Sequence, residues 1–170
     1  MSFIDLAQKR FSCRKFSNKA VEKEKTDKII QAGLLAPTGM NKQPFKIFAI
    51  KDSEKIEKLK LATPFTFGAQ LFLLVCADEN KSYVRPFDNK NFAQIDTTIV
   101  ATHMMLEIAD LGLGTTWVGH FDEKILKEQF PKLNRYCTVA IFPIGYPDEN
   151  VQVSPMHSAS KAKEEIFEIL

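Results

Sequence analysis

The sequence predicts an α+β fold. Apolar residues recur at helical spacing in some segments, whereas in others they alternate or run continuously, as in strands. The two kinds of segment intermix without the regular strand–helix–strand rhythm of a parallel α/β fold. A length of 170 residues is typical of one domain. We therefore expect a single domain over residues 1–170.

The first half of the chain is expected to hold three helices and two strands. In the clearest helix, Ile29, Ile30 and Leu34 recur at helical spacing behind a charged first turn, and Pro37 ends it. We expect Ser53 to cap the third helix. The second strand is apolar on both faces, which is typical of a central strand. In order, these elements are a helix over residues 3–9, a helix over 22–36, a strand over 45–51, a helix over 53–61 and a strand over 70–77.

The second half begins with the polar segment 79–92, which we expect to be a loop or lid. A long segment rich in Ala, Met and Ile follows and predicts the core helix, with Gly112 where a helix C-cap belongs. We expect residues 148–170 to form a polar tail with weak helical character. The elements between are the core helix over residues 92–111, a strand over 115–118, a helix over 122–130 that Asp122 caps, and a strand over 136–145.

Composition excludes several classes of protein. Hydrophobic residues make up 45% and charged residues 26%, which excludes a disordered, collagenous or disulfide-dense chain. Cys13, Cys76 and Cys137 lie far apart, without the spacing of a disulfide framework or a zinc site, so we expect no metal. Reduced thiols, an acidic rather than basic start and the lack of a long apolar run predict a cytoplasmic protein without a membrane partner.

The charge is unevenly distributed. Residues 1–60 hold 14 Lys/Arg against 7 Asp/Glu, a net charge of +7, whereas the whole chain carries only +2. A basic first third indicates a nearby anion, and a solvated lysine face is the alternative. We expect no nucleic-acid partner, because no helix-turn-helix or RNP-like pattern accompanies the basic residues.

Three segments have residues that suit ligand binding. In the first, Arg10, Ser12 and Arg14 share one face of an extended chain, while Phe11 and Cys13 turn toward the core. Two guanidinium groups flanking a hydroxyl can grip a phosphate. An ordinary exposed basic stretch is the alternative.

The second segment, residues 36–44, leaves a helix and enters a strand between two prolines. Gly39 permits a positive φ or close approach of the backbone. Thr38, Asn41 and Gln43 offer donors and acceptors without net charge, which suits ribityl hydroxyls or a heteroaromatic edge. A plain turn is the alternative.

The third segment, residues 112–119, lacks the spacing of the dinucleotide-binding glycine motif. Gly119 can bring a bare backbone N–H against a flat ligand. Trp117 can pack below that ligand, although a lone Trp is more often a core residue.

In this order, the segments resemble the FMN-dependent nitroreductase family. The stretch Arg-Phe-Ser-Cys-Arg-Lys-Phe at 10–16 is similar to its Arg-x-Ser-x-Arg motif, and 35–45 to its Ala-Pro-Ser-x-x-Asn-x-Gln-Pro-Trp motif. Residues 111–119 are similar to its Leu-Gly-Leu-Gly-x-x-Trp-x-Gly motif, and 142–147 to its closing strand. One motif is a weak signal, but four in register are a strong one.

The resemblance implies a central mixed or antiparallel sheet flanked by helices, built as an intertwined homodimer with two FMN sites at the subunit interface. It implies that Arg10 and Ser12 hold the phosphate and ribityl end, and that Arg14 reaches the pyrimidine edge of the flavin. The backbone of Gly119 would face flavin N5 beside Trp117. The partner subunit would contribute the second segment. The implied cofactor-binding residues are Arg10, Phe11, Ser12, Arg14, Pro37, Thr38, Gly39, Asn41, Trp117, Gly119 and Lys161.

The sequence also departs from the family pattern. Phe11 stands where many relatives have a second basic residue, and Met40 replaces a frequent Gly. In the tail, Ser160 stands where relatives often have an Arg, and Lys161 is the neighbouring cation that can replace it as a point charge.

The implied reaction is hydride transfer from NADH or NADPH through flavin N5 to a nitroaromatic, quinone or similar small-molecule acceptor, in a ping-pong cycle. No side chain is required as an acid or base. We expect Tyr83, Arg85 and Phe87 to line the acceptor pocket, because they are aromatic or basic and lie in the expected lid. A non-catalytic FMN- or nucleotide-binding module of the same fold is the alternative.

Overall fold

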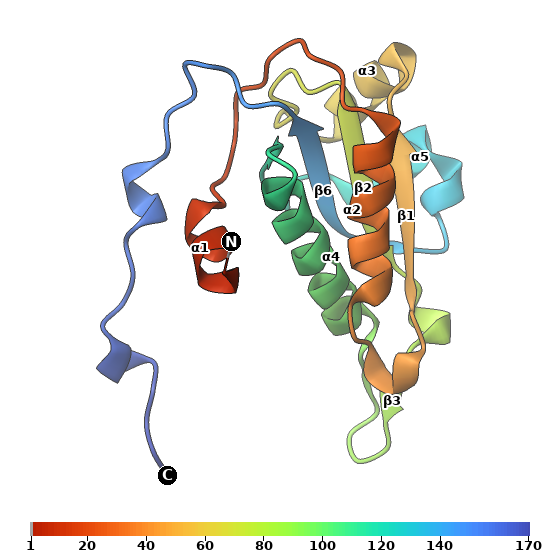
Figure 1. The fold of residues 1–170 in the computed structure, drawn as a ribbon. Helices are drawn as coiled ribbons and strands as arrows, with labels where there is room; N and C mark the ends of the chain where they lie inside the picture. Colours follow the sequence, from red (N-terminus) through yellow and green to blue (C-terminus); the bar gives the residue numbers. More distant parts are fainter. Residues whose placement is uncertain (1) are drawn as a thin grey trace.

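The computed structural model describes residues 2–170, and its centre is a four-stranded antiparallel sheet (Figure 1). The strand order is β1–β2–β6–β5, so strands that pair are not always consecutive in the chain. The α+β prediction with an antiparallel sheet flanked by helices is confirmed. The strands are β1 (Phe45–Ile50), β2 (Leu71–Ala77), β6 (Cys137–Gly145) and β5 (Gly114–Thr115).

Strand β2 is central, as its apolar sequence predicts. All seven of its residues are buried. It pairs with β1 on one side and with β6 on the other, both antiparallel. A strand covered on both faces and both edges offers no position to a polar side chain, which explains the uninterrupted apolar run.

Two pairs of helices cover the two faces of the sheet (Figure 1). On one face lie α2 (Lys23–Leu35) and α4 (Ala93–Asp110), which bury Ile29 and Met104 completely. On the other face lie α3 (Ser53–Ala62) and α5 (Glu123–Gln129), which bury Leu59 and Leu126.

The helix caps follow local chemistry. Asp122 caps α5 as predicted, since its carboxylate accepts from the backbone N–H groups of Lys124 and Ile125. The prediction for α3 was wrong by one residue. Asp52 is its cap, accepting from Lys55 N–H at 3.1 Å, and Ser53 is the first helical residue.

Both ends of the described chain lie outside this three-layered body, in which helices cover both faces of the sheet (Figure 1). Helix α1 (Phe3–Lys9) precedes it, and the tail extends along the same side of the molecule (Figure 1). The tail touches α1 where His157 Nε2 lies 2.8 Å from the carbonyl oxygen of Gln8. Short 3-10 turns complete the chain: η1 (Gly39–Asn41), η2 (Glu79–Lys81), η3 (Pro131–Leu133), η4 (Pro155–His157) and η5 (Lys163–Glu165).

Two expected segments differ in detail from the prediction. The expected loop over 79–92 contains a small hairpin of β3 (Val84–Arg85) and β4 (Lys90–Asn91), which projects from one end of the molecule (Figure 1). The strand expected over 115–118 is only Gly114–Thr115, with a separate bridge between Val118 and Ile141. Among residues 2–170, none of the helices combines the length and apolar character that crossing a membrane requires.

Candidate functional site

The first and third segments of the sequence lie side by side. Ser12 forms a parallel bridge with Thr115, and Cys13 N–H donates to the Thr115 carbonyl oxygen at 2.8 Å. Gly114 makes this approach possible, because a Cβ there would lie only 2.7 Å from Cys13 Cβ and Sγ. The backbone of residues 10–14 is therefore fixed against β5.

This pairing produces the expected alternation only over residues 12–14, and the prediction that Arg10 shares a face with Arg14 while Phe11 turns to the core was wrong. Cys13 is completely buried, whereas Ser12 and Arg14 are exposed. Arg10 and Phe11 are half-buried. They line a hollow of about 110 Å³ near the C-terminal end of α4, beside Met105. Arg14 does not line this hollow and instead lies beside Trp117 and Gly119.

Arg14 lines a second hollow of about 240 Å³, together with Trp117 and Gly119 of the third segment. Trp117 is held by an edge contact with the buried Phe142, at 5.4 Å between ring centroids. At Gly119 a Cβ would meet no atom closer than the Trp117 ring at 3.9 Å. The backbone of Gly119 is thus open to a flat molecule.

Three aromatic residues that the sequence reasoning missed also line this hollow. Phe65 and Phe67 stack at 5.8 Å between centroids, and His120 meets Phe65 edge-on at 5.4 Å. Thr63 holds the backbone at His120, because its hydroxyl donates to the His120 carbonyl oxygen at 2.7 Å. The available signal was two Phe residues beside Gly68 in a short loop. We name this group, with Trp117, the aromatic hollow.

The second segment lies elsewhere. Gly39 N–H donates to Asp96 in the first turn of α4, whereas Arg10 and Phe11 lie beside Ala109 near the other end of the same helix. Ala109 lies thirteen positions after Asp96 in the same helix, which corresponds to about 20 Å along the helix axis. Figure 1 shows the two regions at opposite ends of α4. One copy of the chain therefore does not bring all three segments together.

Of the expected acceptor residues, Tyr83 lies beside the second segment. A Cβ at Gly39 would approach Tyr83 Cβ to 3.1 Å, and the Tyr83 ring meets Phe92 edge-on at 5.6 Å. Arg85 pairs with Asp88 of the same hairpin, with 2.8 Å between Nε and Oδ1, and lowers the pKa of that carboxyl group. Phe87 is 92% exposed. The structure therefore places Tyr83 against the second segment, and Arg85 and Phe87 in the hairpin segment that follows Tyr83.

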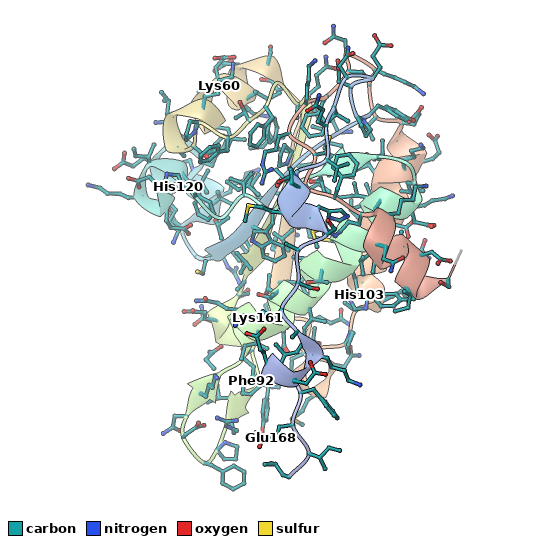
Figure 2. The ribbon with its side chains drawn as sticks, turned by 90° about the vertical axis from the view of Figure 1, so that its left-hand side faces the viewer. Lys60, Phe92, His103, His120, Lys161 and Glu168 are labelled. Carbon is teal, nitrogen blue, oxygen red and sulfur yellow. The ribbon has the colours of Figure 1, made fainter. Side chains whose placement is uncertain are left out.

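The tail residue Lys161 is exposed, and within residues 2–170 it makes no hydrogen bond or ion pair. Figure 2 places it between the levels of His120 and Phe92, on the stretch of tail that runs past the body. Ser160 beside it is exposed as well.

None of the three cysteine thiols is activated as a nucleophile by a lowered pKa. Burial raises the pKa of Cys76 to about 12, and burial also raises the pKa values of Cys13 and Cys137. Over the described part of the chain, His, Cys, Asp and Glu side chains form no cluster that suits a metal ion. The candidate site is therefore a cationic and aromatic binding surface.

Comparison with known proteins adds a family to this geometry. The model of the nitroreductase family matches residues 7–63 and 59–146. The crystal structure of a nitroreductase family protein from Clostridium difficile 630 is 38% identical, with a TM-score of 0.91 over 99% of this chain and 98% of that one. An FMN-dependent nitroreductase from Clostridium difficile R20291 is 28% identical, with a TM-score of 0.75 over 94% and 98% of the two chains. The NADPH-flavin oxidoreductase of Vibrio harveyi is 28% identical over 85% of this chain and 65% of its own.

Proposed function

Because the chain belongs to the nitroreductase family, we propose that it is an FMN-dependent NAD(P)H oxidoreductase that works as a homodimer. The observation that carries the proposal is the division of the three segments. Residues 10–14 and 112–119 pair with one another, whereas Arg10 and Phe11 lie about 20 Å along α4 from the contact between Gly39 and Asp96. A second copy is needed to complete each site, and a two-fold dimer makes two such sites.

The residues present fit a flavin. The aromatic hollow offers flat side chains, an open backbone at Gly119 and the guanidinium group of Arg14 at its edge. Its volume of about 240 Å³ is smaller than the roughly 300–1,000 Å³ typical of ligand pockets. The hollow alone is therefore too small, which supports a site that the partner subunit completes.

We assign the following roles within this site. Exposed Ser12 and half-buried Arg10 hold the phosphate and ribityl end, through donation from the hydroxyl and guanidinium groups. Arg14 lies at the pyrimidine edge, where its charge stabilises negative charge on the reduced ring more strongly than in water. Pro37, Thr38, Gly39 and Asn41 enter from the partner, and Phe11 and Lys161 complete the set. When bound, FMN supplies hydride transfer between two substrates.

NAD(P)H and the acceptor would occupy the same open face in turn, which is a ping-pong cycle. Phe65 and Phe67 offer a stacked surface for a flat acceptor such as a nitroaromatic or a quinone. We also propose that segment 79–92 serves as a lid that adds Tyr83, Arg85 and Phe87 to the acceptor side. The contact of Tyr83 with Gly39 supports this role for the lid. If the partner subunit contributes the second segment to the site, it also brings the residues packed against that segment.

The test uses the purified full chain. We expect a yellow protein of dimeric mass in sedimentation analysis, whose flavin absorbance bleaches with NADH or NADPH and returns when a quinone is added. Initial rates against both substrates should give parallel double-reciprocal lines. A colourless monomer that takes up no FMN in excess would contradict the proposal. A yellow dimer without NAD(P)H oxidation would instead indicate a non-catalytic FMN-binding module.

Arg14→Ala and Arg14→Lys form a matched pair for the role of the guanidinium group. We expect the Ala variant to bind FMN more weakly and to shift the flavin potential to a more negative value. The Lys variant should be intermediate, because it keeps the charge without the planar donors. Wild-type affinity and potential in Arg14→Ala would remove Arg14 from the site.

A further inference from the structure

A buried carboxylate anchors the second segment to the core helix. Asp96 is only 3% exposed, and both of its carboxylate oxygens lie 3.1 Å from the backbone nitrogen of Gly39. Within residues 2–170, no Lys, Arg or His pairs with Asp96. Burying a carboxylate costs free energy unless the group is hydrogen-bonded. The hydrogen bond between Asp96 and a turn at the surface is therefore informative.

The turn that Asp96 holds has an unusual backbone. The φ values of Met40, Asn41 and Gln43 are 52°, 53° and 47°, in the left-handed region that residues other than glycine rarely adopt. Three such residues within four positions persist only where the surroundings impose the conformation.

The hydrogen bonds inside the turn do not fix it to the body. Asn41 N–H donates to the Thr38 carbonyl at 2.9 Å, and Gln43 N–H donates to the Thr38 hydroxyl at 3.0 Å. Both bonds join residues of the turn to one another. The bond from Gly39 to Asp96 differs, because it joins the turn to an element 57 residues further along the chain.

We infer that Asp96 is a positioning residue that presets the turn of residues 38–43 for the cofactor bound at the partner subunit. This inference rests on the proposed function. It assigns the Gly39 N–H to Asp96 and not to a ligand, so that Gly39 shapes the turn while Thr38 and Asn41 present polar groups. Gly39 suits this role because a Cβ would lie 3.1 Å from Tyr83 Cβ and 3.5 Å from Asp96 Oδ2.

The test compares Asp96→Ala and Asp96→Asn with Asp110→Asn, an exposed carboxylate on the same helix. Two quantities are measured on the full-length protein. The first is hydrogen exchange of the amides of residues 38–43 without FMN, and the second is the Kd for FMN by flavin fluorescence. Thermal unfolding and the circular dichroism of bound FMN separate a displaced turn from general loss of stability.

We expect Asp96→Ala to exchange faster at residues 38–43, to bind FMN at least about tenfold more weakly below its unfolding temperature, and to change the circular dichroism of the bound flavin. Asp96→Asn keeps one acceptor oxygen and should lie between Asp96→Ala and the wild type, and it serves if the Ala variant does not fold. Asp110→Asn should match the wild type.

Unchanged exchange at residues 38–43, or an unchanged Kd, in a folded Asp96→Ala variant would overturn the inference. An equal loss in Asp110→Asn would also overturn it, because the effect would then follow helix charge and not the bond to Gly39. If the wild type itself takes up no FMN, the proposed function fails, and the exchange measurement still decides whether Asp96 orders the turn.

Discussion

Replacing Gly114 by Ala should separate the first segment from the sheet. The new Cβ would lie 2.7 Å from both Cβ and Sγ of Cys13, and 3.2 Å from Pro147 Cγ. Cys13 has little room to yield, because it is fully buried and its N–H is bonded to the Thr115 carbonyl oxygen at 2.8 Å.

The magnitude follows from these contacts. Overpacking costs about 1–3 kcal/mol, and weakening one backbone hydrogen bond adds about 1 kcal/mol. We therefore expect Gly114→Ala to lower the free energy of unfolding by about 3 kcal/mol, which lowers Tm by about 6–12 °C for a chain of this length. Since the same shift moves Ser12 and Arg14, FMN binding should weaken as well.

Urea denaturation and fluorescence titration with FMN measure the two effects. Cys13→Gly removes the atoms that clash, so the double variant Gly114→Ala/Cys13→Gly should be more stable than the two single changes predict by addition. A coupling of about 1–2 kcal/mol is expected for residues in direct contact. Strict additivity, or a wild-type Tm in Gly114→Ala, would refute the argument that Gly114 exists to admit Cys13.

Four further predictions concern other parts of the structure. Gly119→Ala should leave Tm unchanged, because the new Cβ would meet nothing closer than 3.9 Å. It should still weaken FMN binding, because the methyl group covers the open backbone. Urea denaturation and fluorescence titration with FMN measure the two effects. Burial raises the pKa of Cys76 from 9.0 to about 12. The contribution of the buried thiol to the free energy of unfolding is therefore complete below pH 9 and is lost as the pH rises toward 12. Urea denaturation between pH 8 and 11 will show the start of this loss. In iodoacetamide labelling of the native protein at pH 8, Cys137 should react and Cys76 should not until urea unfolds the chain. Phe87→Ala should leave Tm unchanged, because the side chain is 92% exposed. It should raise KM for the acceptor, because a lid residue contacts the acceptor. Unchanged acceptor kinetics would exclude the lid role.

The sequence predicted the elements whose causes are local. The apolar run of β2, the helical spacing in α2, the Asp122 cap and Gly112 with φ of +72° all depend on a few neighbouring residues. The cap of α3 was misplaced because Asp52 and Ser53 are both good capping residues, and only the backbone conformation decides between them.

The site was predicted in part. The motifs implied that residues 10–14 and 112–119 serve one cofactor, but not that Ser12 pairs with Thr115 or that Arg10 and Arg14 line different hollows. Phe65, Phe67 and His120 meet through tertiary contacts between residues about 55 positions apart, which no local pattern encodes. The bond between Gly39 and Asp96 was missed for the same reason, because the sequence of the core helix does not show which distant residue a lone Asp contacts.

The burial of β2 has a consequence for how the protein is made. Its seven residues carry no charge and no proline, a composition that favours self-association of exposed strands into aggregates. Both edges of β2 are paired only when β6 has formed. This aggregation-prone segment therefore keeps an unpaired edge until the ribosome has synthesised the chain to residue 145. Truncated chains that end before β6 should therefore precipitate, and recovery after heating should fall as protein concentration rises.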